Sequence, residues 1–203
     1  MFSKIVLEGR TIDLGGHKDS SYVHLIQTKQ PIEIANYDDV QTGTHKVSSG
    51  ADHTFDFEKP FPLPDSSFDN VICANVLEHI FNHKNLIAET YRILKRGGRF
   101  YISVPFFFNI HASPNDYFRY TRVALERLLS EAGFDEITIA ELGDGPCSAI
   151  FQNFGGSIPT ICLKQCFKHI AIGTDTFFSR FSSKYRTIRC RVPLGYFVIA
   201  RKQ

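Results

Sequence analysis

The chain has 203 residues, of which 43% are hydrophobic and 22% are charged. This length and composition suit one packed domain and exclude a disordered chain, so we expect a single domain over residues 1–203. A formal net charge of +2 is too small for a typical nucleic-acid-binding protein, whose basic residues would be in larger excess and clustered on one face. We therefore expect no nucleic acid partner.

The cysteines and the apolar runs bear on location. The five cysteines are odd in number and widely scattered, and no stretch resembles a secretory signal. We therefore expect the protein to be located in a reducing cytoplasm. Cys162 and Cys166 are close together, but no second pair stands at metal-ligand spacing; we expect apolar packing on a helix and assign no metal. No apolar run approaches the roughly 18 residues of a membrane span, which predicts a soluble or at most peripheral protein.

Short β-prone segments recur along most of the chain, separated by turns or by helical periodicity. One of them, Val71–Ala74, is apolar throughout, as expected of a strand that is buried on both faces of a parallel sheet. Residues 35–50 carry no helical periodicity, so the second crossover helix is expected to be short or missing. The predicted strands are Thr11–Leu14, Ile32–Ile34, Thr54–Phe57, Val71–Ala74, Arg99–Val104, Ile137–Leu142 and Gly195–Ala200.

Helices are expected between these strands. Residues 22–26 follow the Gly15-Gly16 turn, and Asn85–Lys95 carries an apolar face that ends at a glycine pair. Thr121 can cap a helix whose apolar positions repeat every 3.6 residues until Gly133. This alternation predicts an α/β fold with a doubly wound, mostly parallel seven-stranded sheet and helices on both faces.

The stretch 146–193 breaks the alternation and is predicted to be a helical insertion or cap before the last strand. Its only acidic residue is Asp175, so it holds most of the positive charge of the chain. A solvated basic exterior is the simpler interpretation, and an anionic substrate or peripheral membrane contact is the alternative; an oligomer interface is also open. The basic residues of the stretch are Lys164, Lys168, Arg180, Lys184, Arg186, Arg189 and Arg191.

Doubly wound sheets bind ligands at the carboxyl ends of their strands, which directs attention to the residues there. Asp13 is followed by the Gly15-Gly16 turn, where a ligand can approach backbone N–H groups. Glu33 lies 20 positions after Asp13 and is expected at the end of the second strand, where an acid can bind the hydroxyls of a ribose. Asn36 or Asp38 takes that place if the strand ends later.

A series of motifs carries a family resemblance. Asp56-Phe57, Phe61 to Asp65, Ser67-Phe68-Asp69, Val76-Leu77-Glu78-His79 and Arg92 to Gly98 occur in the order found in class I S-adenosylmethionine-dependent methyltransferases, of the methyltransferase type 11-like kind. The similarity covers roughly residues 10–142 and the final strand. The family usually has a longer Gly-x-Gly-x-Gly run than this chain's Gly15-Gly16-His17.

The resemblance implies S-adenosylmethionine as cofactor and assigns residues to it. Asp13, Gly15 and Gly16 match the motif that cradles the methionine part, and Glu33 matches the ribose acid. Asp56 and Phe57 match the pair that receives the adenine amino group and packs on its ring, and Asn75 follows the fourth strand against the cofactor.

A second cluster follows the fifth strand. Residues 111–121 resemble a His-x-x-Pro-x-Asp-Tyr-x-Arg-Tyr-Thr stretch in methyltransferases of bacterial surface-polysaccharide and secondary-metabolite pathways. For methyl transfer to a hydroxyl, His111 is our first candidate for the base and His79 the second. Arg119 would position an anionic acceptor, and Asp116 would orient His111 or Arg119. Structural roles for these residues, such as an Asp116–Arg119 ion pair, remain the alternative.

The sequence thus predicts a methyltransferase that acts on a small-molecule or glycan-type acceptor, with O-methylation as the leading expectation. A catalytically degenerate methyltransferase-fold binding module is the alternative from outside the enzymes. An NAD-dependent oxidoreductase is less favoured, because the glycine turn lacks the third glycine of a dinucleotide site.

Overall fold

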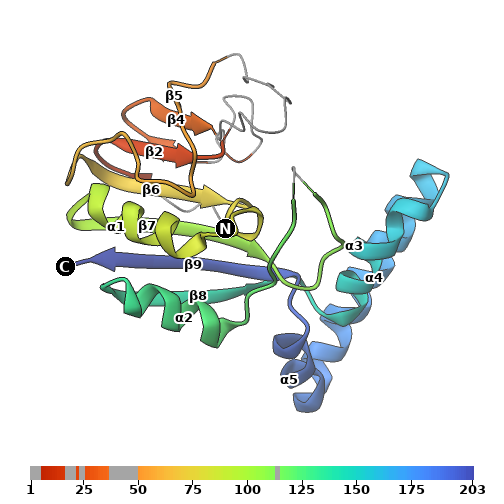
Figure 1. Ribbon diagram of the computed structural model, residues 1–203. Helices are drawn as coiled ribbons and strands as arrows, with labels where there is room; N and C mark the ends of the chain where they lie inside the picture. Colours follow the sequence, from red (N-terminus) through yellow and green to blue (C-terminus); the bar gives the residue numbers. More distant parts are fainter. Residues whose placement is uncertain (1–5, 17–21, 23–25, 37–49, 113–114) are drawn as a thin grey trace.

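The computed structural model describes residues 6–16, 22, 26–36, 50–112 and 115–203. Its centre is a seven-stranded sheet with the order β5-β4-β2-β6-β7-β9-β8. The strands from β5 to β7 are parallel, and β9 runs antiparallel to both of its neighbours (Figure 1). This arrangement confirms the predicted doubly wound, mostly parallel α/β fold. The strands are β2 Thr11–Leu14, β4 Ile32–Asn36, β5 His53–Thr54, β6 Phe68–Ala74, β7 Leu94–Pro105, β8 Phe134–Leu142 and β9 Gly195–Lys202.

A short parallel pair that the sequence did not predict lies outside the main sheet. It joins β1, Val6–Leu7, to β3, Gln27–Thr28. Leu7 and Ile26 belong to the small apolar cluster on one face of the sheet, together with Ile72 of β6. Two-residue strands are too short to show the period-two pattern by which strands are predicted. The helix predicted at residues 22–26 lies outside the described residues, apart from Tyr22 and Ile26.

The larger core lies under two helices, α1 (His83–Ile93) and α2 (Arg122–Glu131), which cover the same face of the sheet (Figure 1). Thr121 caps α2 as predicted, because its side chain accepts a hydrogen bond from the backbone N–H of Ala124 at 3.2 Å. The prediction that the first of these helices continues to Lys95 is wrong. Leu94 instead begins β7, where its backbone pairs with Phe68 of β6.

Arg92 of α1 connects two motifs that are far apart in the sequence, its own motif Arg92 to Gly98 and the turn Phe61 to Asp65. Its guanidinium donates hydrogen bonds to the backbone oxygens of Phe61 at 3.0 Å and Leu63 at 2.8 Å. It also pairs with Asp65 at 2.5 Å and with Glu89 at 2.7 Å. The proline-rich turn after β5 is therefore held against α1 by one side chain.

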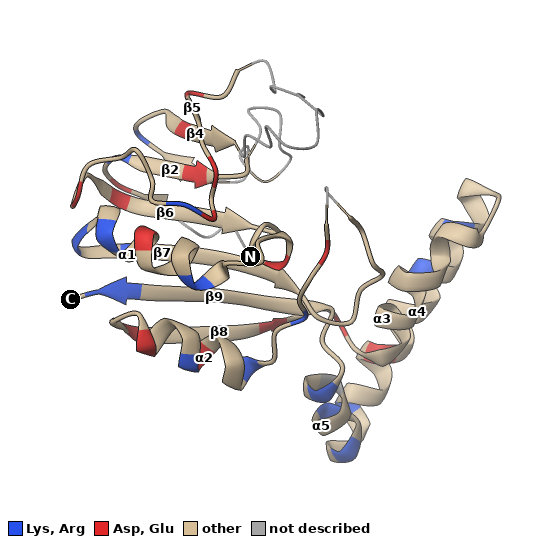
Figure 2. Cartoon of the chain, in the orientation of Figure 1, with Lys and Arg blue, Asp and Glu red and all other residues tan. Residues whose placement is uncertain are grey.

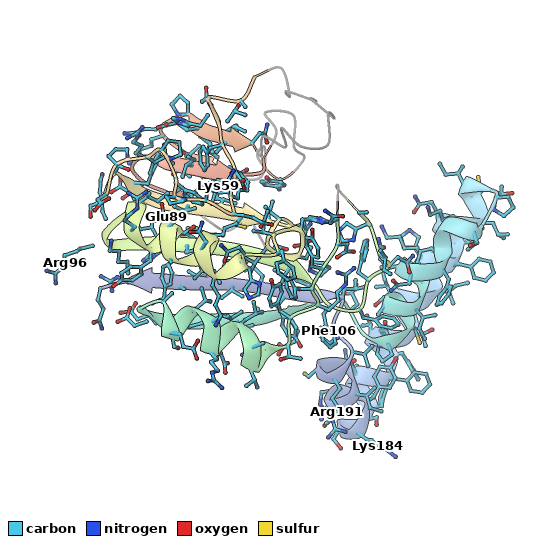
Figure 3. All side chains as sticks on the ribbon, in the orientation of Figure 1. Lys59, Glu89, Arg96, Phe106, Lys184 and Arg191 are labelled. Carbon is cyan, nitrogen blue, oxygen red and sulfur yellow. The ribbon has the colours of Figure 1, made fainter. Side chains whose placement is uncertain are left out.

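The predicted helical insertion is present between β8 and β9. Its helices lie beyond the carboxyl ends of the parallel strands (Figure 1). Figure 3 shows Phe106, Lys184 and Arg191 on that side and Arg96 at the opposite end of the strands. The elements are α3 Pro146–Phe154, the 3-10 turn Gly155–Ser157, α4 Ile161–Phe181 and α5 Ser183–Arg191.

One buried carboxylate joins the helices of the insertion. Asp175 of α4 has no exposed surface, and its side chain accepts hydrogen bonds from the backbone N–H groups of Cys147 at 3.0 Å and Ser148 at 2.7 Å. It also accepts a hydrogen bond from the hydroxyl of Tyr185 in α5. Because these N–H groups belong to the first turn of α3, where a helix has unpaired donors, Asp175 both caps α3 and links it to α5.

The outer part of α4 is exposed. Every residue from Ile161 to Ile170 is exposed, so the prediction that Cys162 and Cys166 pack against apolar neighbours is wrong. Lysine and arginine residues recur along α4 and α5 (Figure 2). Among the helices of the described residues, none has the length and apolar character needed to cross a bilayer.

Candidate active site

The turn after β2 requires its two glycines. Gly15 has φ +80, which L side chains rarely adopt, and its N–H donates to the backbone oxygen of Ala35 at 2.7 Å. A Cβ at Gly15 would overlap the Cγ2 methyl of Val76, and a Cβ at Gly16 would overlap the carboxylate of Asp13. The turn therefore brings backbone close to two neighbours at the carboxyl edge of the sheet.

Asp13 places a carboxylate under this turn. The residue has no exposed surface; the Tyr22 hydroxyl donates to its Oδ2 at 2.6 Å, and its Oδ1 has no hydrogen-bond partner among the described residues. Burial raises the pKa of Asp13 to about 7, although the Tyr22 hydrogen bond opposes that shift. A buried carboxylate oxygen that lacks a donor is suited to bind an N–H or ammonium group of a ligand at this edge.

Asn75 lies at the same edge, directly after β6. It is exposed and has φ 54, and its N–H donates to the backbone oxygen of Ser103 at 2.8 Å. A non-glycine residue with positive φ is often found at a functional site, because the strain must be held by its surroundings. Val76 connects Asn75 to the Gly15 turn. The structure thus brings Asp13, Gly15, Gly16 and Asn75 together, as the sequence predicted.

The placement predicted for Glu33 is wrong. β4 continues to Asn36, so Glu33 lies three positions before the strand end, level with Ile12. Its carboxylate pairs with Arg10 at 2.5 Å and His53 at 2.8 Å, and chiefly the Arg10 hydrogen bond lowers its pKa. The alternative that the sequence left open applies, since Asn36 ends the strand; Asp38 lies outside the described residues.

Asp56 and Phe57 follow β5 but have different surroundings. Asp56 lies beyond the strand end; its carboxylate accepts from the N–H of Glu58 at 2.8 Å and pairs with Lys59 at 3.2 Å. Phe57 has no exposed surface and packs against the rings of Phe55 and Phe61, with centroids 5.3 and 6.0 Å away. The expectation that the Phe57 side chain packs on an adenine ring is therefore wrong, because that side chain is buried in the core.

A polar cluster lies in the segments that follow β6 and β7. Its centre is Glu78, in the short helical turn Leu77–His79, and the sequence analysis assigned no site role to this residue. Glu78 has no exposed surface, and neither carboxylate oxygen has a hydrogen-bond partner among the described residues. Burial raises the pKa of Glu78 to about 7. The only signal in the sequence was its place in the motif Val76-Leu77-Glu78-His79.

His79 and His111 direct their rings at Glu78. The Nε2 atoms lie 3.7 Å (His79) and 3.6 Å (His111) from the Glu78 Oε1 atom, and the two rings meet edge to face with centroids 5.0 Å apart. Burial is the main cause of the lowered pKa of His79. Tertiary structure therefore joins the two predicted histidines in one site.

Asp116 and Arg119 organise the loop that carries His111. Asp116 accepts from the N–H of His111 at 2.9 Å and forms a two-bond pair with Arg119 at 2.5 and 2.7 Å. The Arg119 guanidinium also donates to the backbone oxygens of Phe118 at 2.8 Å and Asn109 at 3.1 Å. Chiefly the Arg119 hydrogen bonds hold the pKa of Asp116 well below its usual range. The Asp116–Arg119 ion pair, which the sequence analysis gave as the structural alternative, is present.

Part of the chain is similar to known methyltransferases. Residues 23–102 match the family described as a methyltransferase domain. Over 105 residues the chain is 33% identical to a probable S-adenosylmethionine-dependent methyltransferase of Mycolicibacterium smegmatis. The matched region covers 48% of this chain and 40% of that protein. The chain thus spans less than half the length of this relative.

Solved structures share the fold at low identity. A Thermotoga maritima methyltransferase, described as a possible histamine N-methyltransferase, is 18% identical with a TM-score of 0.58, covering 97% of this chain and 84% of that one. Haemonchus contortus phosphoethanolamine N-methyltransferase 2, solved with phosphomonomethylethanolamine and S-adenosylhomocysteine, is 17% identical with a TM-score of 0.56, covering 99% and 50%. Together with the sheet order, these matches show that residues 23–102 are similar to a methyltransferase domain and that the chain shares the fold of these solved methyltransferases.

Proposed function

We propose that this protein transfers a methyl group from S-adenosylmethionine to a hydroxyl of a small-molecule or glycan-type acceptor. The observation that supports the proposal best is the position of the cluster Glu78, His79 and His111, which lies close along the chain to Asn75 and to Val76, the neighbour of the Gly15 turn. Cofactor-holding residues and proton-accepting side chains thus share the carboxyl edge of the sheet, where doubly wound folds bind ligands.

The described residues fit the methionine part of the cofactor. Asp13 offers a buried oxygen without a donor, and Gly15 and Gly16 form a turn in which any Cβ would overlap a neighbour. Asp56 would receive the adenine amino group, and Asn36 stands where a ribose contact is expected, at the end of β4. When bound, S-adenosylmethionine supplies a methyl group on a sulfonium, which is already a good leaving group.

The side chains of the cluster then have two tasks, to align the acceptor and to take its proton. His111 is the first candidate for the proton acceptor because it is the more exposed of the two histidines, with 35% of its side chain accessible against 10% for His79. Asp116 fixes the backbone of His111, and Arg119 fixes Asp116. Arg119 would reach an anionic acceptor only by giving up one of these contacts. We therefore assign Arg119 the role of positioning Asp116 and His111, not that of binding the acceptor.

An amine is the second acceptor class. Two of the solved relatives are named as N-methyltransferases, one possibly acting on histamine and one crystallised with phosphomonomethylethanolamine. They share only the fold with this chain at their identities of 18% and 17%. The cluster favours a hydroxyl, because a neutral amine attacks without prior loss of a proton whereas a hydroxyl needs a base.

Calorimetric titration with S-adenosylmethionine, S-adenosylhomocysteine and NADH tests the cofactor. We expect micromolar binding of the first two, roughly −8 kcal/mol, and none of NADH. Asp56→Ala should weaken that binding at least tenfold, whereas Glu33→Ala, at the wrong end of its strand, should retain it. Absence of binding to all three would favour the degenerate binding module, and binding of NADH alone would favour the oxidoreductase.

Transfer of labelled methyl groups to panels of hydroxyl and amine acceptors tests the reaction. His111→Ala should lower turnover about 100-fold or more with cofactor affinity unchanged, in keeping with the usual contribution of a general base. His83→Gln is the matched control, since His83 packs against Phe118 and Tyr120 outside the cluster. Unchanged turnover in His111→Ala would remove His111 from the proposal.

The insertion supports a second proposal, that the enzyme works at the cytoplasmic face of an anionic membrane. Most of the exposed apolar residues of α4 recur at spacings of three, four and seven, which places them on one face of the helix, with basic residues beside them. Co-sedimentation with phosphatidylserine vesicles should decrease in Phe167→Glu, and self-association without vesicle binding would indicate an oligomer interface instead. The apolar residues are Leu163, Phe167, Ile170, Phe177 and Phe181.

A further inference from the structure

Three lone pairs converge in the cluster around Glu78. The two histidine Nε2 atoms lie 3.6 and 3.7 Å from the same oxygen, Oε1 of Glu78, and the three ligand atoms all lie within 4.8 Å of one another. Glu78 is completely buried and accepts no hydrogen bond from any described residue. Burial of a carboxylate is costly unless a cation or a donor faces it, so this arrangement calls for a positive group at its centre.

The hydrogen bonds behind the histidines determine which nitrogen faces Glu78. The Nδ1 atom of His79 lies 2.5 Å from the backbone oxygen of Asn115, and the Nδ1 atom of His111 lies 3.1 Å from that of Asn109. A carbonyl oxygen can only accept, so each Nδ1 must carry the proton and donate it. In the neutral rings each Nε2 is then an unprotonated acceptor, and both point towards the carboxylate.

The distances favour an ion over a shared proton. A separation of 3.6 or 3.7 Å is too long for a hydrogen bond between Nε2 and Oε1. Two ligands of one metal ion stand about 3.0–3.5 Å apart when each bond is about 2.1 Å, so small side-chain rotations would complete such a site. Backbone carbonyls behind the Nδ1 atoms are the usual outer contacts of metal-binding histidines.

We propose that Glu78, His79 and His111 bind one divalent transition-metal ion, such as Zn²⁺, Mn²⁺ or Co²⁺. Two imidazoles and one carboxylate suit these ions better than Mg²⁺ or Ca²⁺, which prefer oxygen ligands. Three protein ligands leave coordination positions open, as in metal sites that act on substrates. The spacing of the cysteines, on which the sequence analysis based its expectation of no metal, has no bearing on this site.

The electrostatics around the cluster agree with a bound cation. The Asp116 carboxylate and the Arg119 guanidinium pair through two hydrogen bonds, so Arg119 acts on Glu78 only at a distance, and neither carboxylate oxygen of Glu78 has a hydrogen-bond partner among the described residues. An ion would enter from the side of His111, which is the most exposed of the three ligands.

The role of the ion in the reaction rests on the proposed function, whereas its binding does not. An acceptor hydroxyl that coordinates the metal would lose its proton to solvent water more readily, because the positive charge stabilises the alkoxide. His111 would then act as a ligand rather than as the proton acceptor. Turnover that is lost on metal removal and restored by Zn²⁺ or Mn²⁺ distinguishes this role from that of a simple base.

Titration of the metal-stripped full chain with Co²⁺ tests binding directly. We expect one equivalent of Co²⁺ to bind with a visible ligand-field absorption band, and competing Zn²⁺ to abolish the band. Glu78→Gln, which keeps the size of the side chain, and His111→Ala should each weaken binding at least tenfold. His169→Ala is the control, because this exposed histidine of α4 lies outside the cluster and its removal should leave the band unchanged.

Calorimetry with S-adenosylhomocysteine on the same samples reports folding and separates the two proposals. Variants that lose Co²⁺ but still bind S-adenosylhomocysteine support the metal site. Absence of the band in the unaltered chain, or a band of normal intensity in both Glu78→Gln and His111→Ala, would overturn it. Cofactor binding and turnover that persist in the metal-free chain would overturn the role of the ion in the reaction, while leaving its binding and the proposed function intact.

Discussion

Replacement of Asp175 should loosen the whole insertion. Its carboxylate accepts hydrogen bonds from the backbone N–H groups of Cys147 and Ser148 and from the Tyr185 hydroxyl, and it has no exposed surface. Each charge-assisted bond contributes roughly 1.5–3 kcal/mol, so Asp175→Ala should cost about 3 kcal/mol or more. Asp175→Asn keeps one acceptor oxygen and should cost about half as much.

Urea unfolding and hydrogen exchange measure this effect. A loss of about 3 kcal/mol lowers the melting temperature by roughly 6–12 °C if the chain unfolds as one unit. If the insertion opens by itself, the loss appears as faster exchange of the amides in α3 and α5. Asp144→Asn is the matched control, because it removes the same charge from an exposed position in the neighbouring turn. Wild-type exchange in α3 of Asp175→Ala would refute the capping role.

The pH dependence of this effect has a definite sign. Burial opposes ionisation of Asp175, but the hydrogen bonds from Tyr185, Ser148 and Cys147 outweigh it and lower the pKa. A folded-state pKa below the unfolded value of about 3.9 means that the stabilisation is present above that pH and is lost as pH falls through the folded-state pKa. The stability difference between the unaltered chain and Asp175→Ala should therefore narrow in acid.

Three further predictions concern other buried contacts. Burial raises the pKa of Asp13 to about 7, so the stabilisation from its protonated form is lost as pH rises from about 4 through 7. The urea unfolding midpoints at pH 5 and pH 8 should therefore differ less in Asp13→Asn than in the unaltered chain. An equal difference in both proteins would contradict this. Gly15→Ala should cost at least about 1–2 kcal/mol for its left-handed backbone, and adding Val76→Ala should recover only the steric part in thermal unfolding. Arg92→Lys cannot keep every contact with the turn after β5 and should lower the melting temperature by several degrees, whereas Arg127→Lys, at an exposed pair, should not.

Local sequence patterns were sufficient wherever one segment carries its own signal. Thr11–Leu14 forms the predicted strand with the same bounds, and the glycine turn after it has the positive φ that the glycine indicated. Thr121 caps its helix because the hydroxyl and the N–H that it binds are three residues apart. These features depend on contacts within a few residues, and the sequence therefore shows them directly.

The errors arose where pairing between distant segments decides the outcome. The end of β4 depends on how far its backbone pairs with β2 and β5, and this pairing carries the strand past Glu33 to Asn36. Phe57 follows the strand as expected, but the core formed with Phe61 occupies its ring. Neither the strand end nor the direction of a ring is encoded in the spacing of residues along the chain.

By itself, the sequence determined the order of the seven strands of the main sheet and the glycine turn, because these rest on residue type and short-range periodicity. The family resemblance and the place after predicted strands indicated the two histidines. Only the tertiary structure decided that Glu78 joins His79 and His111, since these residues come from loops after two different strands. Parallel strands bring their carboxyl ends to one edge whatever the separation along the chain. The loop contacts of Asn109 and Asn115 then set the ring orientations that give the site its chemistry.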